Sequence, residues 1–128
     1  MELYESVRLQ QANIIIQNPA SIIISRTTQT DDGAGGWTPT ISTLPSQTVR
    51  IYDTSYRDMA TLTINDGGYH KSRIKKMVCQ WDADVEAENE TFTDTFNYNG
   101  SDYKIVDVKP KTTQGFVVYK EVFIEEIT

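Results

Sequence analysis

The glycine-rich stretch DDGAGG (residues 31–36) is the part of the sequence that most resembles a ligand loop. A phosphate loop leads from a strand into a helix N-terminus, usually with a lysine at its end, whereas WTPT follows here. A calcium loop of the EF-hand type spaces its acidic ligands at alternate positions, whereas Asp31 and Asp32 are adjacent. The pattern instead predicts a hairpin tip, in which glycines supply positive φ angles and aspartates bind their own backbone.

Residues suited to catalysis are sparse. Nucleophilic chemistry would need the single cysteine, Cys79, or a serine to meet the single histidine, His70, and an orienting carboxylate, and no spacing supports this. Cys79 between Val78 and Gln80 is typical of a small core residue. The acidic run at residues 81–90 is typical of a solvated connection. We therefore expect no enzyme activity, no cofactor and no metal site.

A basic cluster, KSRIKK (residues 71–76), is the sequence's one candidate for contact with nucleic acid. With Tyr69 and Trp81 nearby, its cations could form a strip that binds phosphates and stacks on bases. Twelve basic against eighteen acidic side chains give the chain a net charge of −6, which opposes general attraction to nucleic acid. Any such binding would therefore be local.

Length and composition indicate one domain over residues 1–128, with 38% hydrophobic and 23% charged residues. No apolar run is long enough to span a bilayer, and the N-terminus lacks the basic start and apolar block of a secretory signal. A single thiol cannot close an intrachain disulfide. The sequence is that expected of a soluble protein made in a reducing cytoplasm, with no membrane partner.

The N-terminal half predicts one helix followed by strands. Residues 2–17 suit a short amphipathic helix with an apolar stripe through Leu3, Val7, Ile14 and Ile15, with Tyr4 and Ala12 near it, ended by Asn18-Pro19. Residues 21–28 read as one strand, whose run of three isoleucines suggests burial on both faces or a covered strand. Residues 36–43 read as its hairpin partner, which Pro39 confines to an edge or a strand end. Residues 47–53 read as a further strand, because their apolar and polar side chains alternate along the sequence.

The C-terminal half predicts a long excursion and then hairpins. Residues 54–76 have the weakest strand signal, and residues 77–85 return as a strand. Asn99-Gly100 is the dipeptide that favours a type I′ turn, a second reversal falls in residues 109–115, and residues 116–127 form a long last strand. The fold class expected is mainly β: a small β-barrel of about six strands with an N-terminal α-helix and one long inter-strand loop.

Four segments in order resemble a known family. They are NPASIIISRTTQTDDGAGGWTPTISTLPSQTVRIY (residues 18–52), WDADV (residues 81–85), YNGSDYKIVDVKP (residues 98–110) and GFVVYKEVFIEEI (residues 115–127). Together they resemble the small head-completion, or stopper, proteins of long-tailed bacteriophages and of defective prophage elements of bacilli. They cover 66 of the 128 residues, about half of the chain, and residues 53–76 match least.

The resemblance implies a non-enzymatic virion protein with a small β-barrel and a helix, made in the host bacterial cytoplasm. In that family a ring of copies, typically twelve, lies beneath the adaptor that follows the portal. The ring extends the channel for double-stranded DNA, which it contacts without sequence specificity, and it offers a docking face to tail proteins. A long loop projects into the channel and helps to retain the genome.

By position, residues 54–76 are the candidate channel loop, whether it grips DNA or pairs with neighbouring subunits. Its candidate residues are Met59, Asn65, Asp66, Gly67, Gly68, Tyr69, His70, Lys71 and Arg73. The candidate assembly contacts are Asp31, Asp32 and Trp37. The alternative function is a β-barrel module that binds single-stranded nucleic acid or carbohydrate, which would need Trp37, Tyr52, Tyr69 or Trp81 to cluster on one open face.

Overall fold

The structure is a computed structural model that describes residues 2–31, 33–53 and 74–127. Over these residues it consists of one helix and eight strands. They are α1 (Leu3–Gln17), β1 (Ala20–Ile22), β2 (Ser25–Asp31), β3 (Trp37–Thr43), β4 (Gln47–Asp53), β5 (Ile74–Gln80), β6 (Phe92–Tyr98), β7 (Ser101–Thr113) and β8 (Phe116–Glu126).

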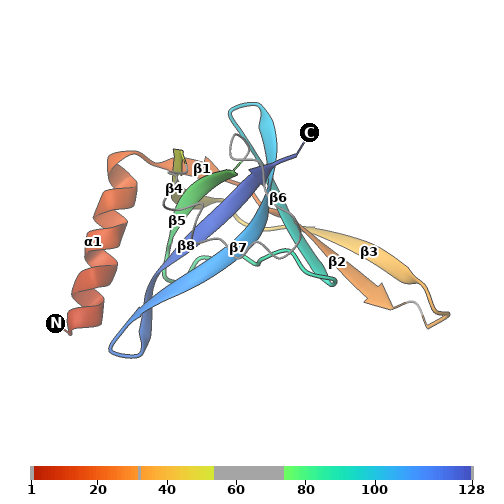
Figure 1. Ribbon diagram of the computed structural model, residues 1–128, viewed down its shortest axis with the longest axis horizontal. Coiled ribbons are helices and arrows are strands. Elements are labelled where there is room, and N and C mark those ends of the chain that lie inside the picture. Colours follow the sequence, from red (N-terminus) through yellow and green to blue (C-terminus); the bar gives the residue numbers. More distant parts are fainter. Residues whose placement is uncertain (1, 32, 54–73, 128) are drawn as a thin grey trace.

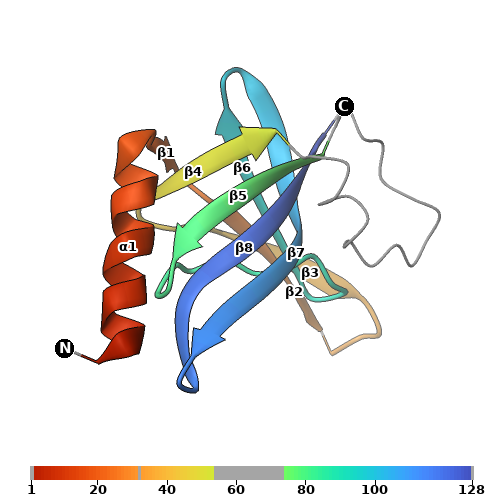
Figure 2. The ribbon, with the colours of Figure 1, turned by 60° about the vertical axis from the view of Figure 1, so that its left-hand side comes forward.

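The strands form one antiparallel sheet in the order β1-β4-β5-β8-β7-β6-β2-β3, which curls into a half-barrel (Figures 1 and 2). The prediction of a mainly β chain with an N-terminal helix is confirmed. The predicted number of about six strands is wrong, because the described chain has eight, and the sheet is a half-barrel rather than a complete small barrel.

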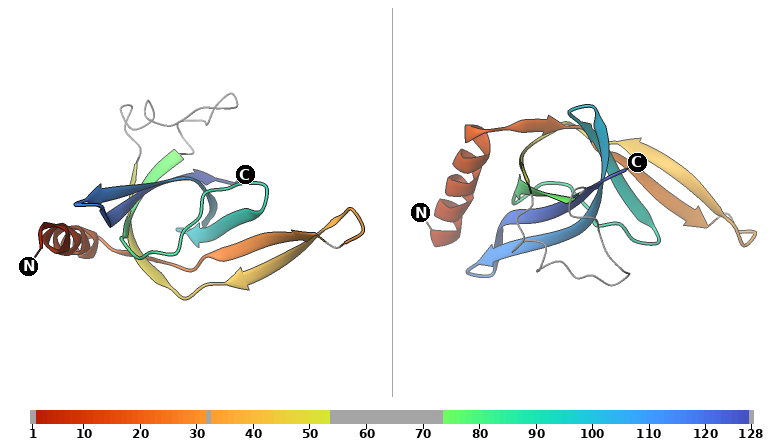
Figure 3. Two further views of the ribbon diagram at one scale, coloured as in Figure 1. Left: turned by 90° about the horizontal axis from the view of Figure 1, so that it is seen from below. Right: turned by 45° about the horizontal axis from the view of Figure 1, so that its top comes forward.

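Part of the difference arises at residues 21–28, which were predicted to form one strand. The structure divides this segment into β1, which pairs with β4, and β2, which pairs with β6 and β3. Ile22 and Ile24 are buried, whereas Ile23 between them is 55% exposed. The segment thus serves two different ladders at opposite sides of the curled sheet (Figure 3).

Two-residue turns build the C-terminal hairpins. Asn99 (φ 51°) and Gly100 (φ 82°) join β6 to β7, as predicted for a type I′ turn. The reversal predicted within residues 109–115 lies at its end, where Gln114 and Gly115 also have positive φ angles. The β7–β8 ladder runs through Pro110 as far as the pair Thr113 and Phe116, so the predicted long last strand is confirmed as β8.

Helix α1 has the predicted bounds to within one residue and ends before Pro19. Most of the predicted stripe is packed: Ile15 is fully buried, Val7 and Ile14 are half-buried, and the Tyr4 ring stacks on Phe116 with centroids 4.1 Å apart. Leu3 is exposed instead, and Arg8 joins the packed face. The predicted stripe is therefore confirmed except at Leu3, and it did not include the arginine.

Arg8 attaches α1 to the sheet through two contacts. Its Nε donates a hydrogen bond to the Val117 carbonyl at 3.0 Å, and its guanidinium lies 3.7 Å from the centroid of the Trp81 ring. At the other end of the helix, Arg50 of β4 donates from Nη1 to the Ile14 carbonyl at 3.0 Å. These side chains fix the helix against one end of the half-barrel.

Cys79 lies in the core of the half-barrel, as its sequence context predicted, and is fully buried. The core side chains packed around it come from both halves of the sheet: Ile22, Ile24, Val49, Met77, Val85, Phe96, Tyr103, Ile105, Val122 and Ile124. Burial raises the pKa of its thiol to about 12, against a smaller opposing effect of the Lys120 charge.

We predict that a thiol reagent does not modify Cys79 in the folded protein and modifies it once urea unfolds the chain. Because the folded state holds the thiol proton more tightly than the unfolded state, the thiol's contribution to stability is present below about pH 9. It is lost as the pH rises towards about 12. Unfolding curves of the wild type and of Cys79→Ala over this range measure the difference. Modification of the native protein as fast as of the unfolded chain would contradict the prediction.

The long excursion predicted over residues 54–76 ends earlier than expected. Strand β5 begins at Ile74, and Lys75 and Lys76 pair with Asp53 and Tyr52 of β4. Two cations of the basic cluster are therefore strand residues, because the ladder continues past the apolar run that starts at Met77. The nine candidate residues of the channel loop, from Met59 to Arg73, lie outside the described residues.

Candidate assembly surface

The β2–β3 hairpin projects from the half-barrel as an arm (Figures 1 and 3). The two strands pair along their whole length, from Ser25 and Thr43 at the base to Asp31 and Trp37 at the tip. On its other side, β2 pairs with β6 only up to Thr28, and the Gln29 amide makes one further hydrogen bond, of 2.9 Å, to the Thr91 carbonyl. Beyond Gln29, none of the described strands pairs with the arm on that side.

The tip of the arm is a turn of the predicted kind. Gly33 and Gly35 have φ angles of 80° and 85°, which side chains rarely tolerate. The Asp31 carboxylate accepts a hydrogen bond of 2.8 Å from the Gly33 amide, so this aspartate binds its own backbone. The chain then continues into β3 rather than into a helix. Of the predicted contacts, Asp31 and Trp37 form the last pair of the ladder, and Asp32 lies outside the described residues.

The two faces of the arm differ in chemistry. Side chains alternate along a strand, so Trp37, Pro39 and Ile41 share one face of β3, and Thr38, Thr40 and Ser42 share the other. All seven residues of β3 are exposed. Trp37 is 64% exposed and Ile41 is 70% exposed. We call Trp37, Pro39 and Ile41 the apolar face of the arm.

Pro39 lies at the free edge of β3. The Gln29 amide points to β6, so the backbone groups of its partner Pro39 point away from β2, to the free edge of the sheet. A proline there leaves a gap in the row of donors that an added strand would use. The expected edge position is confirmed, and the gap makes the apolar face rather than the edge the suitable contact.

Pro39→Val should therefore increase strand-to-strand association. Valine restores the missing N–H and has a high strand propensity, so it completes the free edge of β3. We expect thioflavin-positive aggregation to begin earlier than in the wild type, with the melting temperature little changed. Thr40→Val, whose backbone groups face β2, is the matched control. Equal aggregation of the two variants would show that the free edge is not what Pro39 protects.

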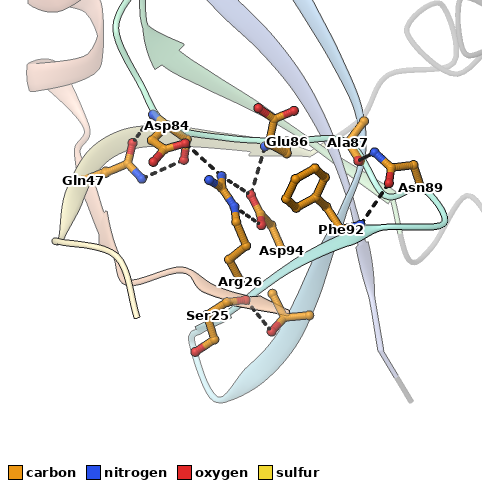
Figure 4. A network of polar contacts seen from close by, with 10 residues as sticks. Ser25, Arg26, Gln47, Asp84, Glu86, Ala87, Asn89, Phe92 and Asp94 are labelled. Carbon is orange, nitrogen blue, oxygen red and sulfur yellow. Dashed lines mark hydrogen bonds and ion pairs between the residues drawn. The ribbon is translucent and has the colours of Figure 1, made fainter. Parts of the chain in front are cut away.

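An ion network fixes the base of the arm (Figure 4). Arg26 of β2 faces Asp94 of β6 in the ladder, and its guanidinium binds both carboxylate oxygens, at 2.8 and 2.9 Å. A second ion pair of 2.9 Å joins Arg26 to Asp84. Asp94 is fully buried, and its hydrogen bond to Arg26 raises the pKa of that guanidinium further above its ordinary value.

The same network ties down the connection between β5 and β6. Asp94 also accepts a hydrogen bond of 2.9 Å from the Glu86 amide. Gln47 exchanges side-chain hydrogen bonds with the backbone amide and carbonyl of Asp84, and Lys120 donates from Nζ to the Ala83 carbonyl at 2.6 Å. Residues 81–85, predicted as the end of a strand, thus follow β5, which ends at Gln80, and the acidic run that contains them is anchored at several points. Sequence reasoning missed this network, because its members are brought together only by the β2–β6 pairing.

The aromatic side chains named for the alternative function lie on different elements. Trp37 is at the tip of the arm, and Trp81 lies against Arg8 of α1. Tyr52 of β4 lies beneath Arg50, at 4.7 Å, and Lys76, at 5.6 Å. Tyr69 lies outside the described residues. The described part of the predicted stacking strip is Lys75, Lys76 and Trp81, and within it Lys76 and Trp81 belong to two different aromatic contacts.

Within the described ranges, no three His, Cys, Asp or Glu side chains gather as they would to hold a metal ion. No helix in the same ranges combines the length and apolar character needed to cross a membrane. Comparisons with protein-family models, with curated proteins and with solved structures found no match to this chain.

Proposed function

We propose that this chain is a structural virion protein of the head-to-tail interface, a head-completion protein of a long-tailed bacteriophage or a defective prophage element. It binds below the portal and adaptor as a ring of copies, typically twelve. The ring extends and closes the channel to retain packaged DNA and offers a docking face to the tail. The chain is made in the bacterial cytoplasm and ends in the virion.

The observation that carries this proposal is the projecting arm. An exposed strand with Trp37 and Ile41 open to solvent has the composition of a contact surface, since aromatic residues are enriched and charges depleted at interface cores. The mainly β chain with an N-terminal helix supports the proposal, and its curled sheet is a half-barrel where the resemblance implies a small barrel. A net charge of −6 suits the wall of a channel that DNA must pass without being trapped.

Removal of the whole chain tests the proposal. Heads assembled in an otherwise intact element that lacks this gene should package DNA and then lose it, and they should not join tails. Nuclease-accessible DNA in purified heads is the measurement, with the gene supplied from a plasmid as control. Heads that keep their DNA and join tails without the chain would overturn the proposal.

Charge reversal at the tip should impair assembly and leave the monomer stable. Replacing Asp31 and Asp32 by lysine removes the acidic tip, and we expect retention on the adaptor-bearing portal complex to weaken about tenfold, because a tip charge governs encounter and register. Asp31→Asn with Asp32→Asn removes the charge and keeps a side-chain oxygen for the Gly33 amide. Unchanged retention of the lysine variant would show that the tip is only a turn and not an assembly contact.

A further inference from the structure

The described chain exposes a second apolar surface, on the outer face of α1. Leu9 and Ile16 are seven positions apart, two helical turns, so they lie on the same side of the helix. They are 52% and 66% exposed, whereas Ile15 on the packed side is fully buried. We call Leu9 and Ile16 the outer stripe of α1.

The outer stripe and the apolar face of the arm lie in the two longest uncharged stretches of the sequence. These are residues 9–25, between Arg8 and Arg26, and residues 33–49, between Asp32 and Arg50. In a chain with 23% charged residues, both stretches are thus unusually free of charge, and the nearest charge to the outer stripe along its own face of α1 is the exposed Glu5, one turn before Leu9. A contact on Ile16 and on the apolar face of the arm would therefore desolvate few charged side chains, as in an interface core.

The two surfaces lie on opposite sides of the molecule. Helix α1 is at one end of the half-barrel and the arm extends from the other, in each of the views (Figures 1, 2 and 3). One molecule therefore cannot bring its own arm onto its own helix. Two different patches at opposite ends of one subunit are what a head-to-tail contact needs, and such contacts close into a ring when the rotation permits.

We propose that the apolar face of the arm of one copy packs on the outer stripe of α1 of the next copy. This inference rests on the proposed function, which requires a ring, and it names the surfaces that form it. The occupant of the arm is thus a second copy of this chain. Pro39 favours packing by the face over strand addition, because it interrupts the donors of the free edge.

The size of the contact explains how such a ring would behave. Side chains such as Trp37, Pro39 and Ile41 together cover roughly 400 Å², about half of the ~800 Å² per partner of a stable specific interface. The contact is therefore weak between two free molecules. It becomes strong when neighbours held on a common platform make it simultaneously, because each contact is then intramolecular. A covalent trap is the appropriate way to detect it in solution.

Disulfide trapping between cysteine variants tests the inference. Ile41→Cys and Ile16→Cys, mixed as full-length folded proteins with a mild oxidant, should form a mixed dimer about tenfold faster than Thr40→Cys with Ile16→Cys, since the favoured contact raises the effective thiol concentration. Thr40 lies on the opposite face of the same strand and is also exposed to solvent. The double variant with both cysteines should form a ladder of dimers, trimers and larger species. The native Cys79 is buried and contributes no background.

Three outcomes would overturn the inference. Equal rates for the Ile41 and Thr40 pairs would mean that the apolar face has no preference for α1. Dimers of Ile41→Cys alone, as fast as the mixture, would mean that two arms pack on each other. A ladder of dimers, trimers and larger species from the double variant Thr40→Cys with Ile16→Cys would mean that the polar face of β3, rather than the apolar face, contacts α1. Each is read from gels and peptide mapping, independently of DNA retention, so a failure here and a failure of the proposed function are distinguishable.

Discussion

Asp94→Ala should lower the free energy of unfolding by about 3–5 kcal/mol, because it leaves the Arg26 guanidinium at the base of the arm without its buried partner. Asp94 is fully buried, binds Arg26 through both oxygens and accepts the Glu86 amide. Its removal therefore leaves the Glu86 amide without its acceptor and leaves Arg26 with its ion pair to the exposed Asp84 in place of the buried one. Urea unfolding followed by circular dichroism measures the loss.

Two variants make this result specific to the buried network. Asp102→Ala, on the exposed part of the adjacent strand β7, removes only a hydrogen bond from Asn97 and should change stability by at most about 0.5 kcal/mol. Arg26→Met combined with Asp94→Leu should recover part of the loss, because neither partner is then an unpaired charge. A loss below about 1 kcal/mol for Asp94→Ala would place the pair among ordinary surface contacts.

Deletion of residues 59–71 should leave the half-barrel folded while filled heads leak DNA. Asp53 and Lys75 are paired in the β4–β5 ladder, so a short connection can join these strands without disturbing the core. The candidate channel loop is thus separable from the fold. Circular dichroism of the purified variant and nuclease-accessible DNA in filled heads are the two measurements. Heads that stay full would contradict the assignment of this segment to the channel.

A matched pair of variants separates the two proposed roles of that segment. Replacing Lys71 and Arg73 by glutamine removes cations and keeps the length of the loop. If the cations grip DNA, these substitutions alone should cause leakage, because phosphate contacts depend on charge. If the loops retain DNA by pairing with neighbouring subunits, the two glutamine substitutions should have little effect, and only the deletion should release DNA.

Local signals in the sequence were enough to predict much of the fold. Asn99-Gly100 marked a two-residue turn because few dipeptides tolerate two positive φ angles, and the structure has it there. Pro39 marked an edge strand, and Asp31 with Gly33 marked a turn that binds its own backbone. In each case, the physical cause lies within a few residues of the signal.

The features that were missed depend on contacts between distant parts of the chain. Nothing near Ile23 shows that β1 and β2 serve opposite sides of the sheet. The pairing of Arg26 with Asp94 requires the β2–β6 register, which no local pattern specifies. The packed face of α1 was predicted without Arg8, which packs through a cation–π contact with Trp81, a role that an apolar stripe does not include. Of the candidate site, the turn at the tip of the arm was predictable from the sequence, and the ion network at the base of the arm was not.

The most direct test of the proposed function is binding of the purified chain to the portal complex of its own genetic element, with and without the adaptor. We expect retention by the adaptor-bearing portal, as a ring in electron micrographs, and none by the portal alone. Loss of retention in Asp31→Lys with Asp32→Lys, at unchanged melting temperature, would trace the contact to the arm. Failure of the wild-type chain to bind the adaptor-bearing portal would show that it is not a head-completion protein of that element.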